Sequence, residues 1–300
     1  MKHWFSYLLF LGFHRLVTLL PMHWVAPACG AIARLAVACG LGRRVVLKNL
    51  EIAFGASLHP AALERLYRDN LRASCLTIIE TLWMARRDRE WVRQQVSISG
   101  WEHVEQALGR RRGALLLGGH FGNWELHNAA LALASNGRYY SYTGRQHNPY
   151  FEGFMTRLRM HAGVQPVSRS PQASRSIIQL LKNNCVMGIC ADQNTSRSPI
   201  FIPFFGKLAA VPEGMATLAV KLDCPVLFSW IVRTAPFQHR IVIQPLTYPR
   251  PGGLRQDREA LARSFLGQLE SIIRDRPADY LWLHKRYRTR PESDPQPVYT

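Results

Sequence analysis

The sequence has few acidic residues, few lysines and no recognisable motif for binding nucleic acid. Its 300 residues hold 20 Asp and Glu against 38 Lys and Arg, a formal net charge of +18. The excess is carried mainly by Arg, in small clusters scattered along the chain. An Arg/aromatic RNA-binding motif, a zinc-finger spacing and a basic tail are all missing, so we expect no nucleic-acid partner. The charge instead favours an anionic membrane surface or an acidic partner.

Cysteine is also scarce, with six residues in the chain. None forms a C-x-x-C pair, and none clusters with His at the spacing of metal ligands. We therefore expect buried, reduced thiols in a protein that faces the cytosol, and no metal site.

The chain lacks an uninterrupted apolar run long enough to cross a membrane. A spanning helix needs about 20 mainly apolar residues, and the apolar N-terminal stretch is broken by His14, Arg15 and Arg34. No convincing cleavage site follows it, so it does not read as a signal peptide. We predict that residues 1–42 form a membrane anchor, which spans the bilayer once or lies in its interface, and that residues 43–300 form the catalytic domain. The alternative is a hydrophobic helix pair packed on that domain.

The remainder alternates between short apolar runs and helical periodicity, beginning with a helical pattern over residues 61–86. Buried strands are expected at 114–117, 139–143, 186–191, 226–232 and 240–244. Helices are expected near 123–135, 149–162, 172–184, 213–222 and 257–274. This alternation predicts an α/β domain with a largely parallel central sheet flanked by helices.

The stretch GALLLGGHFGNWEL (113–126) carries the best candidate for chemistry. His120 follows a predicted strand end, where open α/β sheets place their ligands. Gly122 permits a turn or a close approach to substrate, Asn123 is a candidate N-cap, and Glu125 falls in the first helical turn. A carboxylate that holds one imidazole nitrogen makes the other a better base. We predict that Glu125 orients His120 and that His120 deprotonates a substrate hydroxyl; the alternative is a structural His beside a Glu that favours a helix start.

GGHFGNWE resembles the H-x4-D/E signature of glycerolipid acyltransferases, in the Glu-bearing form of the bacterial lipid A biosynthesis acyltransferases. Further segments agree with that family in order and cover most of the chain: RRVVLKNLEIAFG, TGRQHNPYFEGFMTRLRMHAGV, GICADQNTSRSPIFIPFFGKLAAVPEG and YLWLHKRYRTRP. One departure is Val211, where related sequences often carry Thr, so a hydroxyl role at that position is in doubt.

The resemblance implies a site in which His120 is the catalytic base and Glu125 its partner. Arginines in the region that follows the predicted strand at 139–143 are expected to bind the anionic groups of the substrate or the reacting carbonyl. The residues expected to bind substrate are Gly122, Asn123, Arg145, Asn148, Arg157, Arg159, Asp192 and Gln193.

The resemblance also implies a reaction. A fatty acyl chain passes from an acyl thioester, carried by the acidic acyl carrier protein, to a hydroxyl of a phosphorylated lipid A precursor. This is a secondary acylation step of lipopolysaccharide biosynthesis, expected at the cytoplasmic face of the bacterial inner membrane and without a cofactor beyond the thioester. The alternatives are acylation of another glycolipid, from acyl-CoA or acyl carrier protein, and a basic lipid- or nucleic-acid-binding protein without activity.

The sequence leaves two alternatives for the loop IFIPFFG. It is either an exposed apolar patch or a loop packed into the core.

Overall fold

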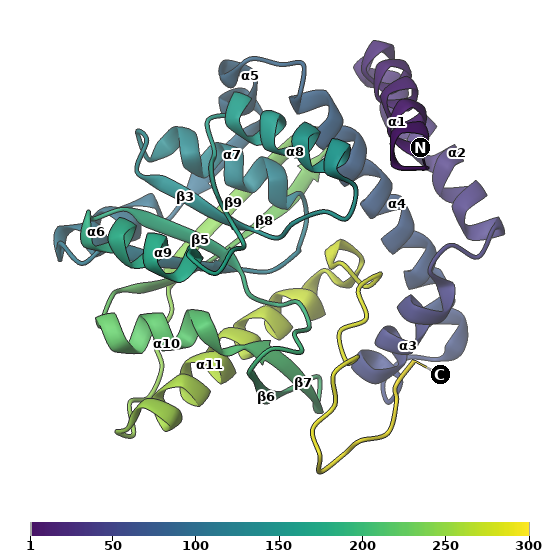
Figure 1. Ribbon diagram of the computed structural model, residues 1–300. Coiled ribbons are helices and arrows are strands. Elements are labelled where there is room, and N and C mark those ends of the chain that lie inside the picture. The colour runs from purple at the N-terminus through teal and green to yellow at the C-terminus, as the bar shows by residue number, and fades with distance from the viewer. Residues whose placement is uncertain (1, 300) are drawn as a thin grey trace.

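The computed structural model describes residues 2–299 and builds them around one large sheet (Figure 1). The helices are α1 (Lys2–Leu19), α2 (Met22–Ala38), α3 (Arg43–Phe54), α4 (Pro60–Met84), α5 (Arg89–Gln95), α6 (Trp101–Gly109), α7 (Trp124–Ala134), α8 (Pro149–His161), α9 (Ala173–Lys182), α10 (Glu213–Leu222), α11 (Leu254–Asp275) and the short 3-10 helix η1 (Pro277–Asp279). The strands are β1 (Val96–Ser99), β2 (Ala114–Gly118), β3 (Tyr139–Thr143), β4 (Gln165–Ser168), β5 (Val186–Cys190), β6 (Pro199–Phe204), β7 (Lys207–Pro212), β8 (Val226–Ala235) and β9 (Gln238–Pro245).

The central sheet has seven strands in the order β1-β9-β8-β2-β5-β3-β4. All neighbouring pairs are parallel except β8 and β9, which form an antiparallel hairpin. The strands β8, β2, β5, β3 and β4 therefore all end at the same edge of the sheet. This confirms the predicted α/β fold with a largely parallel sheet, and it gathers the connections from β2 to α7, from β3 to α8 and from β4 to α9 at one edge.

Helices cover both faces of the sheet. Strand β2 shows why its sequence is a continuous apolar run: Leu115 and Leu117 pack in one core cluster, and Ala114 and Leu116 pack in the cluster on the opposite face. In Figure 1, α10 and α11 lie on one side of the sheet, and α7 and α8 lie on the other.

The first two helices pack on the outer side of α4 (Figure 1). Val17, Val25 and Cys29 are buried there against Trp83 of α4 and Phe237. Within residues 2–299, no single helix is long and apolar enough to span a membrane; α2 and α3 reach that length and composition only together, across a bend of 94°. The membrane anchor and the domain boundary at residue 42 therefore stay predictions.

The segment IFIPFFG adopts a structure that the sequence reasoning did not foresee. It belongs to β6, which pairs with β7 in a separate two-stranded antiparallel hairpin. Phe204 and Phe205 at its end are buried, and Phe204 contacts Tyr280. For these two residues the exposed-patch alternative is wrong, because their rings complete the core between the hairpin, α3 and the C-terminal segment.

Candidate active site

The register of the sheet brings two predicted residues together. Strands β2 and β5 are parallel neighbours in which Gly118 lies opposite Cys190, and the Ala191 amide donates to Gly118 O at 3.0 Å, which extends the ladder by one residue. His120 and Asp192 each lie two positions beyond that pair. The carboxyl edge of the sheet thus places an imidazole beside a carboxylate.

The His120 ring is held by Asp192. Nδ1 donates to Oδ1 of Asp192 at 2.7 Å, and the His120 amide donates to Oδ2 at 2.8 Å. This arrangement makes Nε2 the basic nitrogen, and the Gln193 side-chain amide donates to it at 3.3 Å. Asp192 is buried and His120 lines the cavity described below.

His120 and Asp192 shift each other's pKa values. Burial by itself lowers the pKa of His120, but the Asp192 carboxylate, and Glu125 more weakly, raise it above the usual value of 6.5. Burial would raise the pKa of Asp192, but the ring and the amide of His120 lower it to about 2. Asp192 is therefore a carboxylate at neutral pH, and His120 is a more basic imidazole than an isolated one.

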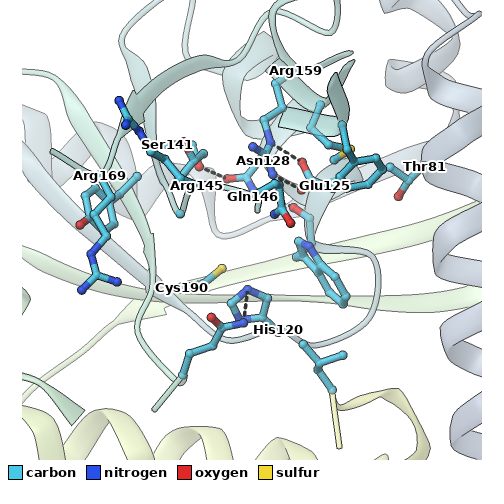
Figure 2. A pocket seen from close by; sticks show the side chains of 18 of the residues that line it. Thr81, His120, Glu125, Asn128, Ser141, Arg145, Gln146, Arg159, Arg169 and Cys190 are labelled. Carbon is cyan, nitrogen blue, oxygen red and sulfur yellow. Dashed lines mark hydrogen bonds and ion pairs between the residues drawn. The ribbon is translucent and has the colours of Figure 1, made fainter. Parts of the chain in front are cut away.

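The predicted contact between His120 and Glu125 is wrong. Glu125 lies in the first turn of α7 and accepts two hydrogen bonds from Arg159 of α8, from Nε at 2.9 Å and from Nη2 at 2.5 Å. Both side chains are nearly buried, at 7% and 11% exposure. Figure 2 shows this pair on a different side of the cavity from His120. The helix start aims Glu125 at α8, so its charge reaches His120 only through space, whereas Asp192 touches the ring.

Helix α4 fixes the loop that carries His120, a contribution the sequence reasoning missed. Thr77, Glu80 and Thr81 lie on one side of α4. Thr77 Oγ1 donates to Gly122 O at 3.2 Å, Thr81 Oγ1 donates to Asn123 Oδ1 at 3.2 Å, and Asn123 Nδ2 donates to Glu80 at 3.2 Å. Polar residues at positions i, i+3 and i+4 in the mainly apolar C-terminal half of α4 were the available signal.

Gly122 and Asn123 serve the loop rather than line the cavity. Asn123 caps α7 as predicted, because Oδ1 accepts from the Leu126 amide at 3.0 Å. Gly122 has φ of +59°, and a Cβ there would lie 2.4 Å from Ile231 O. Gly122 thus permits both the turn and the close approach of the loop to β8.

A cavity of about 650 Å³ opens above His120, within the size range of small-molecule sites. One wall is apolar and combines α1, α4 and α8; it includes Phe10, Ile78, Leu82, Phe151 and Met155. The other wall is polar and basic; it includes Asn128, Ser141, Arg145, Arg159 and Arg169 (Figure 2). Within residues 2–299, Glu125 is the only acidic residue that lines it, and its charge is matched by Arg159.

The other predicted binding residues divide between the cavity and the surface. Arg145, Arg159 and Gln193 line the cavity. Asn148 caps α8 by accepting from the Tyr150 amide, and it also bonds to α1. Arg157 lies 3.5 Å from the hydroxyl of Tyr7, outside the cavity. Arg169, which the sequence reasoning did not single out, follows β4 directly, and its amide donates to Thr143 O.

The residues of the site have no arrangement typical of a metal centre. Across residues 2–299, no group of three His, Cys, Asp or Glu side chains is placed to hold a metal ion. Cys190 lines the cavity, but burial and the nearby carboxylates raise its pKa far above the usual value, so it is a thiol rather than a nucleophilic thiolate. The arrangement that remains is a base held by a carboxylate, in a cavity with one apolar and one cationic wall.

Comparison with known proteins matches the sequence of the chain to a family. The family model of bacterial lipid A biosynthesis acyltransferases matches residues 1–289, nearly the whole chain. The chain belongs to that family, and it is an acyltransferase.

Individual relatives agree. The chain is 28% identical to the lipid A biosynthesis palmitoleoyltransferase of Escherichia coli (strain K12) over 256 residues, which covers 82% of this chain and 79% of that protein. It is 26% identical to the lipid A biosynthesis lauroyltransferase of the same strain, over 86% of each chain. A shorter similarity, 27% over 43% of this chain, links it to the phosphatidylinositol mannoside acyltransferase of Mycobacterium tuberculosis (strain ATCC 25618 / H37Rv).

Proposed function

We propose that this protein transfers a fatty acyl chain from an acyl thioester to a hydroxyl of a phosphorylated lipid A precursor, as a secondary acylation step of lipopolysaccharide biosynthesis. The observation that carries the proposal is the His120–Asp192 pair at the floor of a cavity with an apolar and a cationic wall. The names of the full-length relatives support the choice of acceptor.

In this mechanism His120 is the general base and then the general acid. Nε2 takes the proton of the acceptor hydroxyl while the oxygen attacks the thioester carbonyl carbon. When the tetrahedral intermediate collapses, the C–S bond breaks and the departing sulfur takes the proton back from Nε2. Asp192 keeps the ring in one tautomer and stabilises the imidazolium between the two steps. The Gln193 amide must leave Nε2 before the hydroxyl can occupy its place.

Arg159 is the candidate donor for the oxyanion. It is nearly buried, and two of its five N–H groups are used by Glu125, so three remain. A guanidinium that is already positioned by a buried carboxylate can stabilise developing negative charge without reorganising. Glu125 is then a positioning residue for Arg159, which gives the five-residue spacing from His120 a purpose other than direct contact.

The donor is proposed to be acyl carrier protein, because an acidic carrier matches a chain of net charge +18. The apolar wall from α1, α4 and α8 is proposed to hold the acyl chain. Neither a metal nor an organic cofactor is part of the proposed reaction.

We place the protein on the cytoplasmic face of the bacterial inner membrane. Helix α1 supports this location, because Phe5, Leu9, Leu16 and Leu19 are each more than 60% exposed on its surface. An exposed apolar face of this kind is typical of a helix that lies in the membrane interface. The same helix contributes Phe10 to the cavity, so a membrane-bound α1 would open the site toward the lipid.

A second candidate is acylation of another glycolipid, from acyl-CoA or from acyl carrier protein. The similarity to the phosphatidylinositol mannoside acyltransferase favours it, but that similarity spans less than half of each chain. A basic binding protein without activity is the remaining alternative, and it is tested by the same experiment as the reaction.

That experiment is acyl transfer from purified acyl carrier protein to lipid A precursor by His120→Ala. A positioned base contributes roughly 10²–10⁴-fold in rate, so the variant should lose at least about that factor. Mass spectrometry of the product lipid measures the transfer.

The matched control is His161→Ala, which removes an exposed His at the end of α8. It should retain wild-type turnover, and melting curves should show His120→Ala folded. Near wild-type turnover in a folded His120→Ala protein would contradict the mechanism.

A further inference from the structure

A second concavity lies between α2 and α4, outside the cavity that holds His120. It has a volume of about 420 Å³ and is lined by small apolar residues of α2, among them Gly30 and Ala33, and by the α4 residues Arg68, Asp69 and Arg72. Arg34 of α2 completes its rim. We call this concavity the α2–α4 groove.

The charge of the α2–α4 groove is uncompensated. Arg34, Arg68 and Arg72 are exposed, and within residues 2–299 none of their side chains makes an ion pair or a hydrogen bond. The single acid on the rim, Asp69, leaves the groove with a net charge of +2. Three free guanidinium groups around one concavity are suited to the oxygens of a phosphate.

The surface around the α2–α4 groove indicates which kind of phosphate compound it suits. Arg34 is followed by Leu35, which is 66% exposed, and Trp24 of the same helix is 59% exposed. Successive residues of a helix point about 100° apart, so the charged rim borders an exposed apolar face. A surface that combines apolar side chains with a basic concavity matches the boundary between the acyl chains and the phosphates of a bilayer.

We infer that the α2–α4 groove binds the headgroup of an anionic phospholipid of the membrane. The phosphate contacts Arg34, Arg68 and Arg72, and an acyl chain of the same lipid lies along the apolar side chains of α2. This inference rests on the proposed membrane location, and it names the lipid chemistry that the location requires. The lipid bound here is not a substrate, because the groove is separate from the cavity at His120.

The test is binding of the full-length protein to phosphatidylcholine vesicles with and without phosphatidylglycerol, measured by flotation. Wild type should bind the phosphatidylglycerol vesicles more tightly. Arg68→Gln and Arg72→Gln should each weaken that binding about fivefold, the factor that corresponds to about 1 kcal/mol per basic residue near an anionic surface. Their binding to pure phosphatidylcholine should not change.

The matched control is Arg65→Gln, which removes an exposed arginine of the same helix that does not line the groove. An equal loss in Arg65→Gln would show that the effect is general surface charge and would overturn the inference. Native mass spectrometry from detergent gives a second readout: phosphatidylglycerol should remain bound to wild type and be lost from the Arg68→Gln/Arg72→Gln double variant. Retention by the double variant also overturns it.

Replacing Leu9 and Leu16 by Asn separates this inference from the proposed α1 anchor. Loss of binding to both kinds of vesicle would support the α1 anchor. If the Asn variant binds both kinds as wild type does, the α1 anchor fails. The groove is judged by its arginine variants in either case.

Discussion

His120 and Glu125 are only five residues apart, yet their side chains contact different partners. Asp192 holds the ring of His120, whereas Glu125 is bound by two N–H groups of Arg159. In the proposed reaction the two carboxylates therefore have different roles. Asp192 acts on the base through a hydrogen bond, and Glu125 acts on a cation of the cavity wall.

The pH dependence of kcat/KM should report the Asp192 charge. A general base must be neutral, so activity rises with pH as His120 loses its proton. Because Asp192 raises the pKa of His120, the acid limb of the wild-type profile should lie above pH 6.5. In Asp192→Asn the limb should move to lower pH, and the plateau should fall by about 10²–10⁴-fold because the ring loses its orientation.

Glu125→Gln is the comparison for that profile. Glu125 raises the pKa of His120 less than Asp192 does, so the acid limb of the Glu125→Gln profile should move to lower pH by less than that of Asp192→Asn. An acid limb that stays in place in Asp192→Asn would show that the carboxylate does not set the basicity of the ring.

Arg145 should contribute to acceptor binding through the phosphate. It lines the cavity and makes no ion pair within the described chain, so it is available to a phosphate oxygen. Arg145→Ala should raise KM for the phosphorylated acceptor about tenfold, as expected for one charge-assisted hydrogen bond, with kcat little changed.

Arg157→Ala is the matched control, because Arg157 lies outside the cavity. The structure thus separates two arginines that the sequence reasoning treated alike. Equal use of a dephosphorylated acceptor by the wild-type enzyme would contradict a phosphate contact.

At the scale of elements, α4 connects the loop that carries His120 to the end of the neighbouring strand β8 and to the turn that follows it. Glu80 of α4 is fully buried, and its carboxylate accepts from Arg233 of β8, from Asn123 and from the Phe237 amide. Burial alone would raise the pKa of Glu80, but the neighbouring His239 and Arg233 lower it to about 2. The loop that carries His120 is therefore supported by the buried Glu80–Arg233 ion pair, which is lost when acid protonates Glu80.

Glu80→Gln should destabilise the protein in a pH-dependent way. At pH 7 it leaves Arg233 buried without its partner, which costs about 3–5 kcal/mol of unfolding free energy. The folded-state pKa of Glu80 is lower than the unfolded value of 4.5, so its stabilisation is complete above pH 4.5 and is lost as pH falls toward 2. The deficit of the variant should therefore shrink between pH 7 and pH 3.

Urea unfolding at the two pH values measures this deficit. Glu102→Gln, at an exposed position of α6, is the control and should have little effect at either pH. A Glu80→Gln deficit that is equal at pH 7 and pH 3 would show that its carboxylate does not carry the stabilisation.

At the scale of the whole molecule, the net charge of +18 should influence donor binding. Attraction between a basic enzyme and an acidic carrier is screened as the Debye length falls from about 10 Å at 0.1 M salt to about 3 Å at 1 M. With acyl carrier protein as donor, kcat/KM should fall by about tenfold or more over that range.

An acyl-pantetheine thioester is the control donor, because it has the reacting group without the acidic protein. Its kcat/KM should change much less with salt. The same steep loss with both donors would place the salt effect on the acceptor or the fold, and it would remove the support for an acidic carrier.

The sequence by itself determined the local structure and therefore the positions of the reactive residues. The apolar run at 114–117 predicted β2, the run at 186–191 predicted β5, and His120 and Asp192 were each placed just beyond a strand end. Such features depend on a few neighbouring residues, because backbone propensity and hydrophobic period are local properties. The family motif added the acyl-transfer chemistry.

Only the tertiary structure decided which carboxylate serves His120. The hydrogen-bond register makes β2 and β5 neighbours and brings Asp192 to the ring, while packing of α7 against the rest of the domain leaves Glu125 to Arg159. Strand order and helix orientation result from how all the apolar faces are buried together, so they cannot be deduced from a five-residue spacing. A carboxylate 72 positions away in sequence is therefore in contact with His120, and the one five positions away is not.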